Sequence, residues 1–271
     1  MTKAPGGFMP VPDPPVPQTG PGEIRVVQSR KPLQYGEGTY RWVYLWHLPI
    51  RVTHWFAAGA IAVLVITGLY IADPYLGTSG EPSAHFMMGW IRFFHFSAAA
   101  VLVAAAILRV YWLFFGNQYE SWKALFPLTP RDWKNTWRQV TAYVLVRPDR
   151  APHYLGHNPL QQMNYTILYL VAIIEIATGF GMYGLSDTGG LFFRGFNWVG
   201  PLFGGWQMVR LVHHALMWFF IIFLPIHVYL VVRAAFMDRS GTLTSIFTGG
   251  RFVRDDVGWE DASFELEGDQ G

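Results

Sequence analysis

Four long apolar stretches separate the polar segments of this chain. They cover about residues 52–72, 91–115, 165–185 and 208–232. Each is long enough to cross the hydrocarbon core of a bilayer, which needs about 20 residues in a helix. The apolar positions run without the alternation of a membrane β-strand, and a helix satisfies its own backbone hydrogen bonds in lipid. The pattern therefore predicts an all-α fold, an integral membrane four-helix bundle.

The segments outside the bundle have a different composition. Residues 1–40 are rich in Pro and Gly and lack an apolar core of signal-peptide length, so we expect a disordered N-terminal tail rather than a secretory signal. Residues 41–235 form the four-helix membrane domain. Residues 236–271 form a C-terminal tail.

The loop between the second and third spans contains a shorter periodic pattern. In "RDWKNTWRQVTAYVLV", one helical face carries Trp133, Trp137, Val140 and Val144, while the cations fall elsewhere. This spacing predicts a short amphipathic helix. Two placements remain open: the helix lies on the cytoplasmic membrane surface, or it packs on the bundle as a soluble loop helix.

Composition supports a membrane protein and limits its chemistry. Of 271 residues, 52% are hydrophobic and 14% are charged, which excludes a typical soluble domain. The 12 tryptophans suit a chain with many helix ends at the membrane–water interface. The chain has no cysteine, which excludes disulfides, iron–sulfur clusters and covalent c-type haem. A metal would have to be held by His, Met or carboxylate side chains.

The cations are distributed unevenly among the loops. Of the 20 Lys and Arg residues, 14 lie in the segment before Arg51, the loop between the second and third spans and the C-terminal tail, whereas the loops at about 73–90 and 186–207 hold only Arg194. Lys and Arg accumulate on the cytoplasmic side of membrane proteins. We therefore expect a multi-pass protein of the bacterial inner membrane with both termini in the cytoplasm. The lipid membrane is its expected surrounding, and no nucleic-acid partner is expected.

Histidines recur in the spans, where ionisable side chains are costly and usually functional. His213 and His227 are fourteen residues apart, which at 100° per residue puts them on one helix face, roughly 21 Å apart along the axis. His214 faces elsewhere. Given the predicted helix directions, His95 and His213 share one depth, the outer level. His54 and His227 share the other, the inner level.

Each level supplies two imidazoles from different helices. Two imidazoles on opposite sides of a haem leave the iron no open position, which suits electron transfer rather than oxygen chemistry. Two such levels predict a dihaem core that conducts electrons across the membrane. The alternative is a haem-free anchor or transporter subunit, whose histidines only make interhelical hydrogen bonds and which shows no visible absorption.

Arginines accompany the proposed ligands. Arg51, Arg92 and Arg210 each precede one by three residues and so share its helix face. We expect them to bind haem propionates, because the guanidinium fork matches a carboxylate; snorkelling to lipid phosphate is the alternative. Arg109 is expected at the inner haem's propionates or in a quinone pocket, with the same alternative. Glu175, in the middle of the third span, is either a hydrogen-bonded structural carboxyl or a proton donor to a quinone.

These residues together resemble a known family, the b-type cytochrome subunits of membrane-bound uptake nickel–iron hydrogenases, which are related to formate dehydrogenase gamma subunits. "RVTHW" from Arg51, with "ITG" from Ile66, and "HHALMWFFIIFLPIH" from His213 look like the signatures of its first and fourth helices. "MGWIRFFHFSAA", "GHNPLQQ" and "TSIFTGGR" are similar to three further segments. The resemblance covers about residues 44–254.

The resemblance implies two haem b groups, one held by His95 and His213 and one by His54 and His227. It implies partners, namely a hydrogenase small subunit with a C-terminal membrane helix and a large subunit. Electrons would pass from the small subunit's iron–sulfur relay through the haems to a quinone. The chain would not itself be catalytic for hydrogen. A cytochrome b (gamma) subunit of a formate dehydrogenase or related reductase is the alternative.

Overall fold

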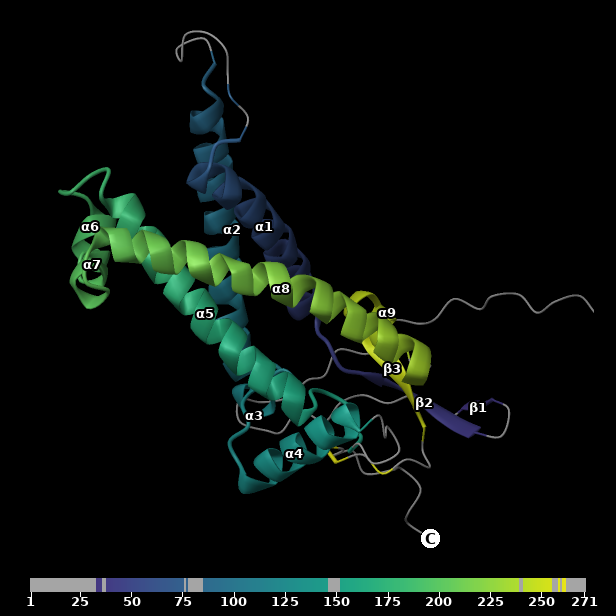
Figure 1. Ribbon diagram of the computed structural model, residues 1–271. Helices are drawn as coiled ribbons and strands as arrows, with labels where there is room; N and C mark the ends of the chain where they lie inside the picture. Colours follow the sequence, from purple (N-terminus) through teal and green to yellow (C-terminus); the bar gives the residue numbers. More distant parts are fainter. Residues whose placement is uncertain are drawn as a thin grey trace, which may run out of the picture.

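Four long helices dominate the structure (Figure 1). They are α1 (Leu48–Ala72), α2 (Met87–Phe115), α5 (Pro159–Gly184) and α8 (Trp206–Asp238), and they confirm the four predicted spans. All four are long and apolar enough to cross a membrane. The computed structural model describes residues 33–35, 38–75, 77, 85–145, 152–238, 241–254, 258 and 260–261. The disorder expected for the start of the N-terminal tail falls outside these residues.

The long helices begin before the hydropathy pattern places them, and at α5 polar residues set the start. At α5, the Asn158 side chain accepts from the Gln161 backbone N–H while the Gln161 side chain accepts from the Asn158 N–H. This capping box satisfies backbone donors that a helix N-terminus leaves unpaired, and Pro159 follows at the first helical position. Before α8, Gly204 and Gly205 have φ of 80° and 122°, which only glycine adopts without strain.

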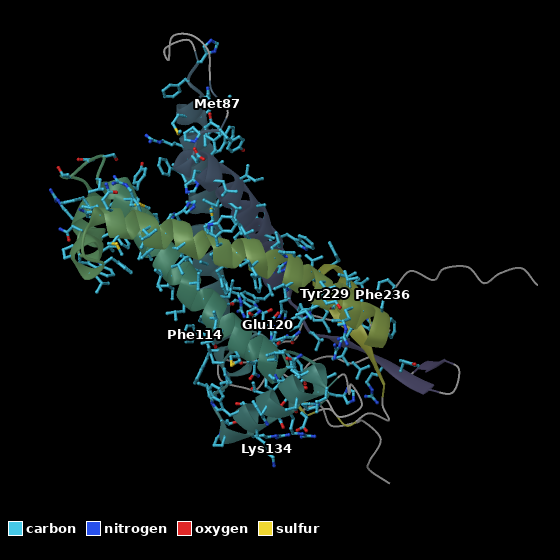
Figure 2. All side chains as sticks on the ribbon, in the orientation of Figure 1. Met87, Phe114, Glu120, Lys134, Tyr229 and Phe236 are labelled. Atoms are coloured by element: carbon cyan, nitrogen blue, oxygen red, sulfur yellow. The ribbon has the colours of Figure 1, made fainter. Side chains whose placement is uncertain are left out.

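The long helices pack as two pairs. α1 lies along α2 and α5 along α8, and α8 also contacts α1; in Figure 1, α8 crosses the others. Short helices α6 (Leu191–Phe196) and α7 (Val199–Leu202) connect α5 to α8. Large apolar side chains such as Phe114, Tyr229 and Phe236 are exposed on the outer faces (Figure 2). This exposure is expected where lipid surrounds the helices instead of water.

The all-α prediction is incomplete, because the two tails form a small antiparallel sheet. Its strands are β1 (Leu33–Tyr35), β2 (Gly38–Tyr44) and β3 (Gly250–Arg254), in the order β1-β2-β3. Val43 of β2 is fully buried and Arg41 nearly so, which gives β2 the alternation of a half-buried strand. The sheet therefore joins the end of the expected N-terminal tail and the first residues of the expected membrane domain to the expected C-terminal tail.

The sheet belongs to a larger assembly at one end of the bundle, which we call the inner cap. It comprises the three strands, α3 (Trp122–Leu125), α4 (Pro130–Val144) and α9 (Thr242–Thr248). The Asp261 carboxylate fastens the C-terminal tail to it by accepting the backbone N–H groups of Leu155 at 2.7 Å and Gly156 at 2.9 Å. Desolvation raises the pKa of Asp261, and these two bonds oppose that rise.

The predicted amphipathic helix is confirmed as α4, and its orientation is informative. Its polar face is buried: Asn135 and Gln139 are 3% and 5% exposed, and the Asn135 amide donates to the Tyr154 hydroxyl at 2.8 Å. Its apolar face is exposed, with Trp137 at 70%. A soluble loop helix would bury the apolar face, so this arrangement favours the membrane-surface placement, with Trp133 beside Trp137 in the interface.

Single-cysteine labelling tests this placement cleanly, because the chain has no native cysteine. An environment-sensitive dye on Trp137→Cys is expected to emit as in lipid and to be quenched by lipid-borne quenchers. On Arg138→Cys, about 100° around the helix, the dye should report water. A membrane-impermeant maleimide should reach Arg138→Cys in cells only after permeabilisation. Equal, water-like emission at both positions would contradict the placement.

Candidate functional site

The inner level brings His54 of α1 and His227 of α8 together across the bundle. Their ring centroids are 6.3 Å apart, with 48° between the ring planes. An imidazole nitrogen binds a first-row metal at about 2 Å and the ring centre lies roughly 1 Å beyond it, so two imidazoles on opposite sides of one ion have centres about 6 Å apart. The spacing therefore fits one metal ion bound between the two rings.

The outer level brings His95 of α2 and His213 of α8 close enough to interact electrostatically. Two glycines lie against these rings. A Cβ at Gly68 would be 3.6 Å from His95 Cε1, and a Cβ at Gly179 would be 3.4 Å from His213 Cε1. Because neither position carries a side chain, α1 and α5 approach the two imidazoles closely and leave room for a flat ligand beside them.

A threonine next to each glycine contacts Nδ1 of the ring. The Thr67 hydroxyl lies 2.8 Å from His95 Nδ1, and the Thr178 hydroxyl lies 2.9 Å from His213 Nδ1. Each hydroxyl donates its proton to a carbonyl four residues earlier in its own helix, so it accepts from the ring N–H. This fixes the hydrogen on Nδ1 and leaves Nε2 as the free ligand nitrogen. The sequence reasoning missed both threonines, although the repeated Thr-Gly pairs could have revealed them.

Glu175 makes a second contact with His213, in addition to that of Thr178. Its Oε2 lies 2.6 Å from His213 Nδ1, whereas its Oε1 is buried without a partner among the described residues. Glu175 therefore lies beside a proposed ligand, and its role as a structural carboxyl or as a proton donor stays a prediction. At the inner level, His54 Nδ1 is buried and has no partner in the described part of the chain. The outer ligands are thus held by more hydrogen bonds than His54.

The donor set fits a haem better than a bare ion. In the described ranges, no group of three or more His, Cys, Asp or Glu side chains could hold a metal. A haem brings four nitrogen ligands of its own, so two imidazoles complete its iron. Each level supplies such a pair of imidazoles, and at the outer level the contacts at Nδ1 leave Nε2 as the nitrogen that can bind.

The arginines of the outer level are exposed. Arg92 and Arg210 lie on the surface near the outer end of α2 and α8, and Arg210 donates to the Gln207 side chain at 3.0 Å. Their positions allow contact with either a propionate or a lipid phosphate. Both interpretations of these residues therefore remain predictions.

The arginines of the inner level are held by the inner cap. Arg51 donates to the Phe247 carbonyl of α9, while its Nε is buried and unpartnered among the described residues. An unpaired buried donor one turn from His54 suits a propionate. Arg109 donates to the backbone carbonyl of Glu120 at 3.1 and 3.2 Å. It therefore fastens the loop after α2, a role that the spacing did not predict.

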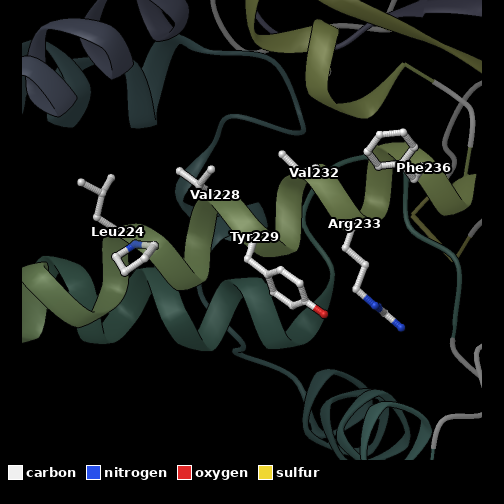
Figure 3. Close-up of a pocket in the computed structure, with 7 residues that line it drawn as sticks. Leu224, Val228, Tyr229, Val232, Arg233 and Phe236 are labelled. Atoms are coloured by element: carbon white, nitrogen blue, oxygen red, sulfur yellow. The ribbon is translucent and has the colours of Figure 1, made fainter.

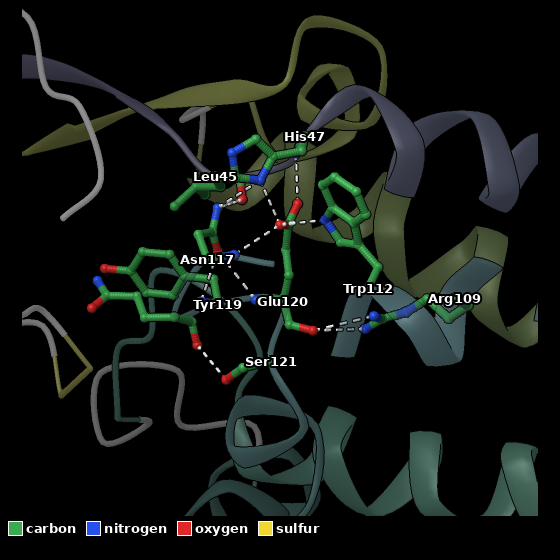
Figure 4. A network of polar contacts seen from close by, with 9 residues as sticks. Leu45, His47, Arg109, Trp112, Asn117, Tyr119, Glu120 and Ser121 are labelled. Carbon is green, nitrogen blue, oxygen red and sulfur yellow. Dashed lines mark hydrogen bonds and ion pairs between the residues drawn. The ribbon is translucent and has the colours of Figure 1, made fainter. Parts of the chain in front are cut away.

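Glu120 is the centre of a polar network that sequence reasoning also missed (Figure 4). Its side chain is fully buried. Oε1 lies 2.6 Å from the backbone N of His47, and Oε2 accepts from Trp112 Nε1 at 3.0 Å and Asn117 N at 3.1 Å. His47 Nδ1 lies 2.6 Å from Oε2. A buried carboxylate with four donors is fully satisfied, so the network locks the end of α2 to the start of α1.

A second histidine of this end, His157, behaves differently. Its ring packs against Trp46 and Tyr165 with centroids 4.9 and 4.8 Å away. Desolvation, together with the nearby charge of Arg109, lowers the pKa of His157 to about 3. His157 is therefore neutral at physiological pH and acts as a packing residue.

An open apolar groove runs along α8 beyond His227 (Figure 3). Its volume is about 630 Å³, and all of its lining belongs to α8 itself: Leu224, Pro225, Val228, Tyr229, Val232, Arg233 and Phe236. Pro225 removes one helical hydrogen bond here. A groove lined by one helix is an outer face open to lipid, so it does not enclose a cofactor.

Comparison with known proteins gives a consistent result. The family described as "Prokaryotic cytochrome b561" matches residues 45–249. A protein of Azotobacter chroococcum mcd 1 named "Probable Ni/Fe-hydrogenase B-type cytochrome subunit" is 37% identical over 219 residues, which are 79% of this chain and 90% of that protein. A protein of the same name from Cupriavidus necator is 37% identical over 220 residues, 78% of this chain and 88% of its own. The "Probable Ni/Fe-hydrogenase 1 B-type cytochrome subunit" of Escherichia coli K12 is 31% identical over 213 residues, 77% of this chain and 90% of its own.

Proposed function

This chain belongs to the prokaryotic cytochrome b561 family, and from that membership we propose that it conducts electrons through two b haems from a nickel–iron hydrogenase to a quinone. Its place as a membrane b-type cytochrome subunit of such a hydrogenase is supported by relatives at 31–37% identity over most of the chain. Those relatives carry hydrogenase names, so we propose a hydrogenase partner rather than a formate dehydrogenase. The chain itself would not activate hydrogen.

The observation that carries the proposal is the 6.3 Å separation of the His54 and His227 rings. We propose that these residues hold the inner haem through Nε2 and that His95 and His213 hold the outer one. When bound, each haem supplies a site for one electron. The four histidines would hold the haem irons, and the surrounding apolar helices would exclude water from both sites.

The direction of transfer follows from the predicted orientation. We propose that the outer level faces the periplasm, where the hydrogenase small and large subunits would dock, the small subunit through its C-terminal membrane helix. The inner cap would lie at the cytoplasmic surface of the inner membrane, in keeping with the cations of its loops. Quinone reduction would then occur near the inner level, beside Arg51 and Arg109.

A haem count on the purified protein tests the proposal. We expect about two haems b per chain by pyridine haemochrome, with low-spin bands in the reduced-minus-oxidised spectrum. In membranes with its hydrogenase partner, hydrogen should reduce both haems, and added quinone should reoxidise them. If the purified protein contained no haem, the four histidines would be packing residues and the proposed redox function would be wrong.

A further inference from the structure

His47, the residue just before α1, is placed to transfer protons. Its ring is anchored on one side only: Nδ1 faces Glu120 Oε2 at 2.6 Å, while no partner is found for Nε2 among the described residues. The His47 side chain is 27% exposed, whereas Glu120 is fully buried. A carboxylate only accepts hydrogen bonds, so Nδ1 carries a hydrogen and Nε2 is the ring nitrogen that the network leaves free.

The pairing of a buried carboxylate with an imidazole is an arrangement used for proton transfer. The carboxylate fixes the ring orientation and stabilises the positive charge when the other nitrogen takes up a proton. Glu120 is suited to this role because Trp112 and Asn117 also donate to it, which holds its oxygens in place. The network therefore presents one oriented, partly exposed imidazole nitrogen at the end of α1.

The position of His47 relates it to the inner level. His47, Arg51 and His54 follow one another at intervals of four and three residues, so they lie on one face of the same stretch of chain. Seven residues correspond to a rise of about 10 Å. His47 thus lies just before the first residue of α1, on the side of His54 that faces the inner cap.

We propose that the pair of His47 and Glu120 is the proton donor for quinone reduction at the inner level. This inference rests on the proposed function. Reduction of a quinone to a quinol consumes two electrons and two protons. A haem held at the inner level would supply the electrons. Each proton leaves His47 Nε2, where an N–H bond breaks, and forms an O–H bond at a quinone oxygen; water on the cytoplasmic side then restores the proton.

The charges around His47 are consistent with this role. Glu120 faces Nδ1 from the loop after α2, and Tyr44 of β2 packs edge-on against the ring at 5.6 Å. Arg51 is directed to α9 and Arg109 to the Glu120 carbonyl, so neither cation is bound to the ring. His157 cannot replace His47, since its lowered pKa keeps it neutral.

The test separates electron transfer from proton transfer in membranes that hold the hydrogenase complex. His47→Gln keeps a side chain that can donate to Glu120 but cannot exchange protons, and His47→Ala removes the group. Both are expected to keep two haems and wild-type haem reduction by hydrogen, but to form quinol about 100-fold more slowly with a short-chain benzoquinone or naphthoquinone. Added imidazole should partly restore His47→Ala. His153→Gln, which changes an exposed histidine at the same end, should match the wild type.

The outcomes distinguish the two proposals. Wild-type quinol formation in His47→Gln, or slow haem reduction in both His47 variants, would overturn the proton role and leave the proposed function intact. A fall in quinol formation that imidazole does not relieve in His47→Ala would also overturn it, because a purely structural role predicts that result. Wild-type membranes that form no quinol with hydrogen would overturn the proposed function, and this inference with it.

Discussion

Replacing His213 with alanine is expected to leave the purified protein with about one haem per chain in place of two, because bis-histidine iron loses half of its protein ligands. His227→Ala should have the same effect at the inner level. His214→Ala is the matched control: it removes the adjacent histidine of the same helix, which faces elsewhere, and should keep both haems. Pyridine haemochrome measures the count directly. Loss of a haem from His214→Ala but not from His213→Ala would contradict the assignment.

The two levels should fail differently in electron transfer. Without the outer haem, in His95→Ala or His213→Ala, hydrogen should reduce the remaining haem only very slowly, since the path of roughly 21 Å between levels is interrupted at its start. Without the inner haem, in His54→Ala or His227→Ala, the outer haem should still be reduced by hydrogen while quinone reduction stops. If hydrogen reduced the remaining haem equally fast in both sets of variants, a linear path from the outer to the inner level would be contradicted.

Sequence predicts the membrane-spanning part of this fold well. Continuous apolar runs specify helices because lipid offers the backbone no other hydrogen-bond partner. The bounds of α5 differ from the hydropathy pattern because the start of the helix is set by Asn158 and Gln161, which are polar. The sheet of the inner cap was not predicted, since β2 and β3 are short and pair across some two hundred residues of chain. Such pairing depends on tertiary contact more than on local propensity.

The candidate site also has a part that the sequence predicts and a part that it does not. The histidines are visible in sequence because ionisable groups in apolar helices are rare, and the helical repeat assigns them to levels. Their supporting groups are not visible, because threonine in a membrane helix usually bonds only its own backbone. Thr67 and Thr178 do that as well, and only the packing of α1 on α2 and α5 on α8 reveals that they also face His95 and His213.

The contacts of His213 lead to a second prediction of large effect. Its Nδ1 faces two acceptors, the Thr178 hydroxyl at 2.9 Å and Glu175 Oε2 at 2.6 Å, whereas His95 Nδ1 faces Thr67 alone. Hydrogen bonds to the ring nitrogen that does not bind the metal, here Nδ1, raise the basicity of a ligating imidazole and so favour the oxidised iron. We therefore expect a haem at the outer level to have the lower potential. Electrons would then run downhill to the inner level, where His54 Nδ1 has no such partner among the described residues.

Glu175→Gln combined with Thr178→Val should remove most of this support while leaving the fold intact. Supporting groups of this kind typically change metal affinity by about 10–100-fold, and a tenfold preference between oxidation states corresponds to about 60 mV for one electron. We therefore expect the lower-potential step of a redox titration, followed in the haem absorption band, to rise by about that amount. The higher-potential step should stay in place.

The control for this titration lies on the same helix. The Thr166 hydroxyl donates to the Gln162 carbonyl four residues earlier, as Thr178 does to Ile174, and no contact of Thr166 with a histidine is found among the described residues. Thr166→Val should thus leave both potentials unchanged. A shift of the higher-potential step in the double variant would mean that the levels are assigned in the wrong order. No shift at all would mean that the two acceptors only position His213, and that the downhill path from the outer to the inner level has another origin.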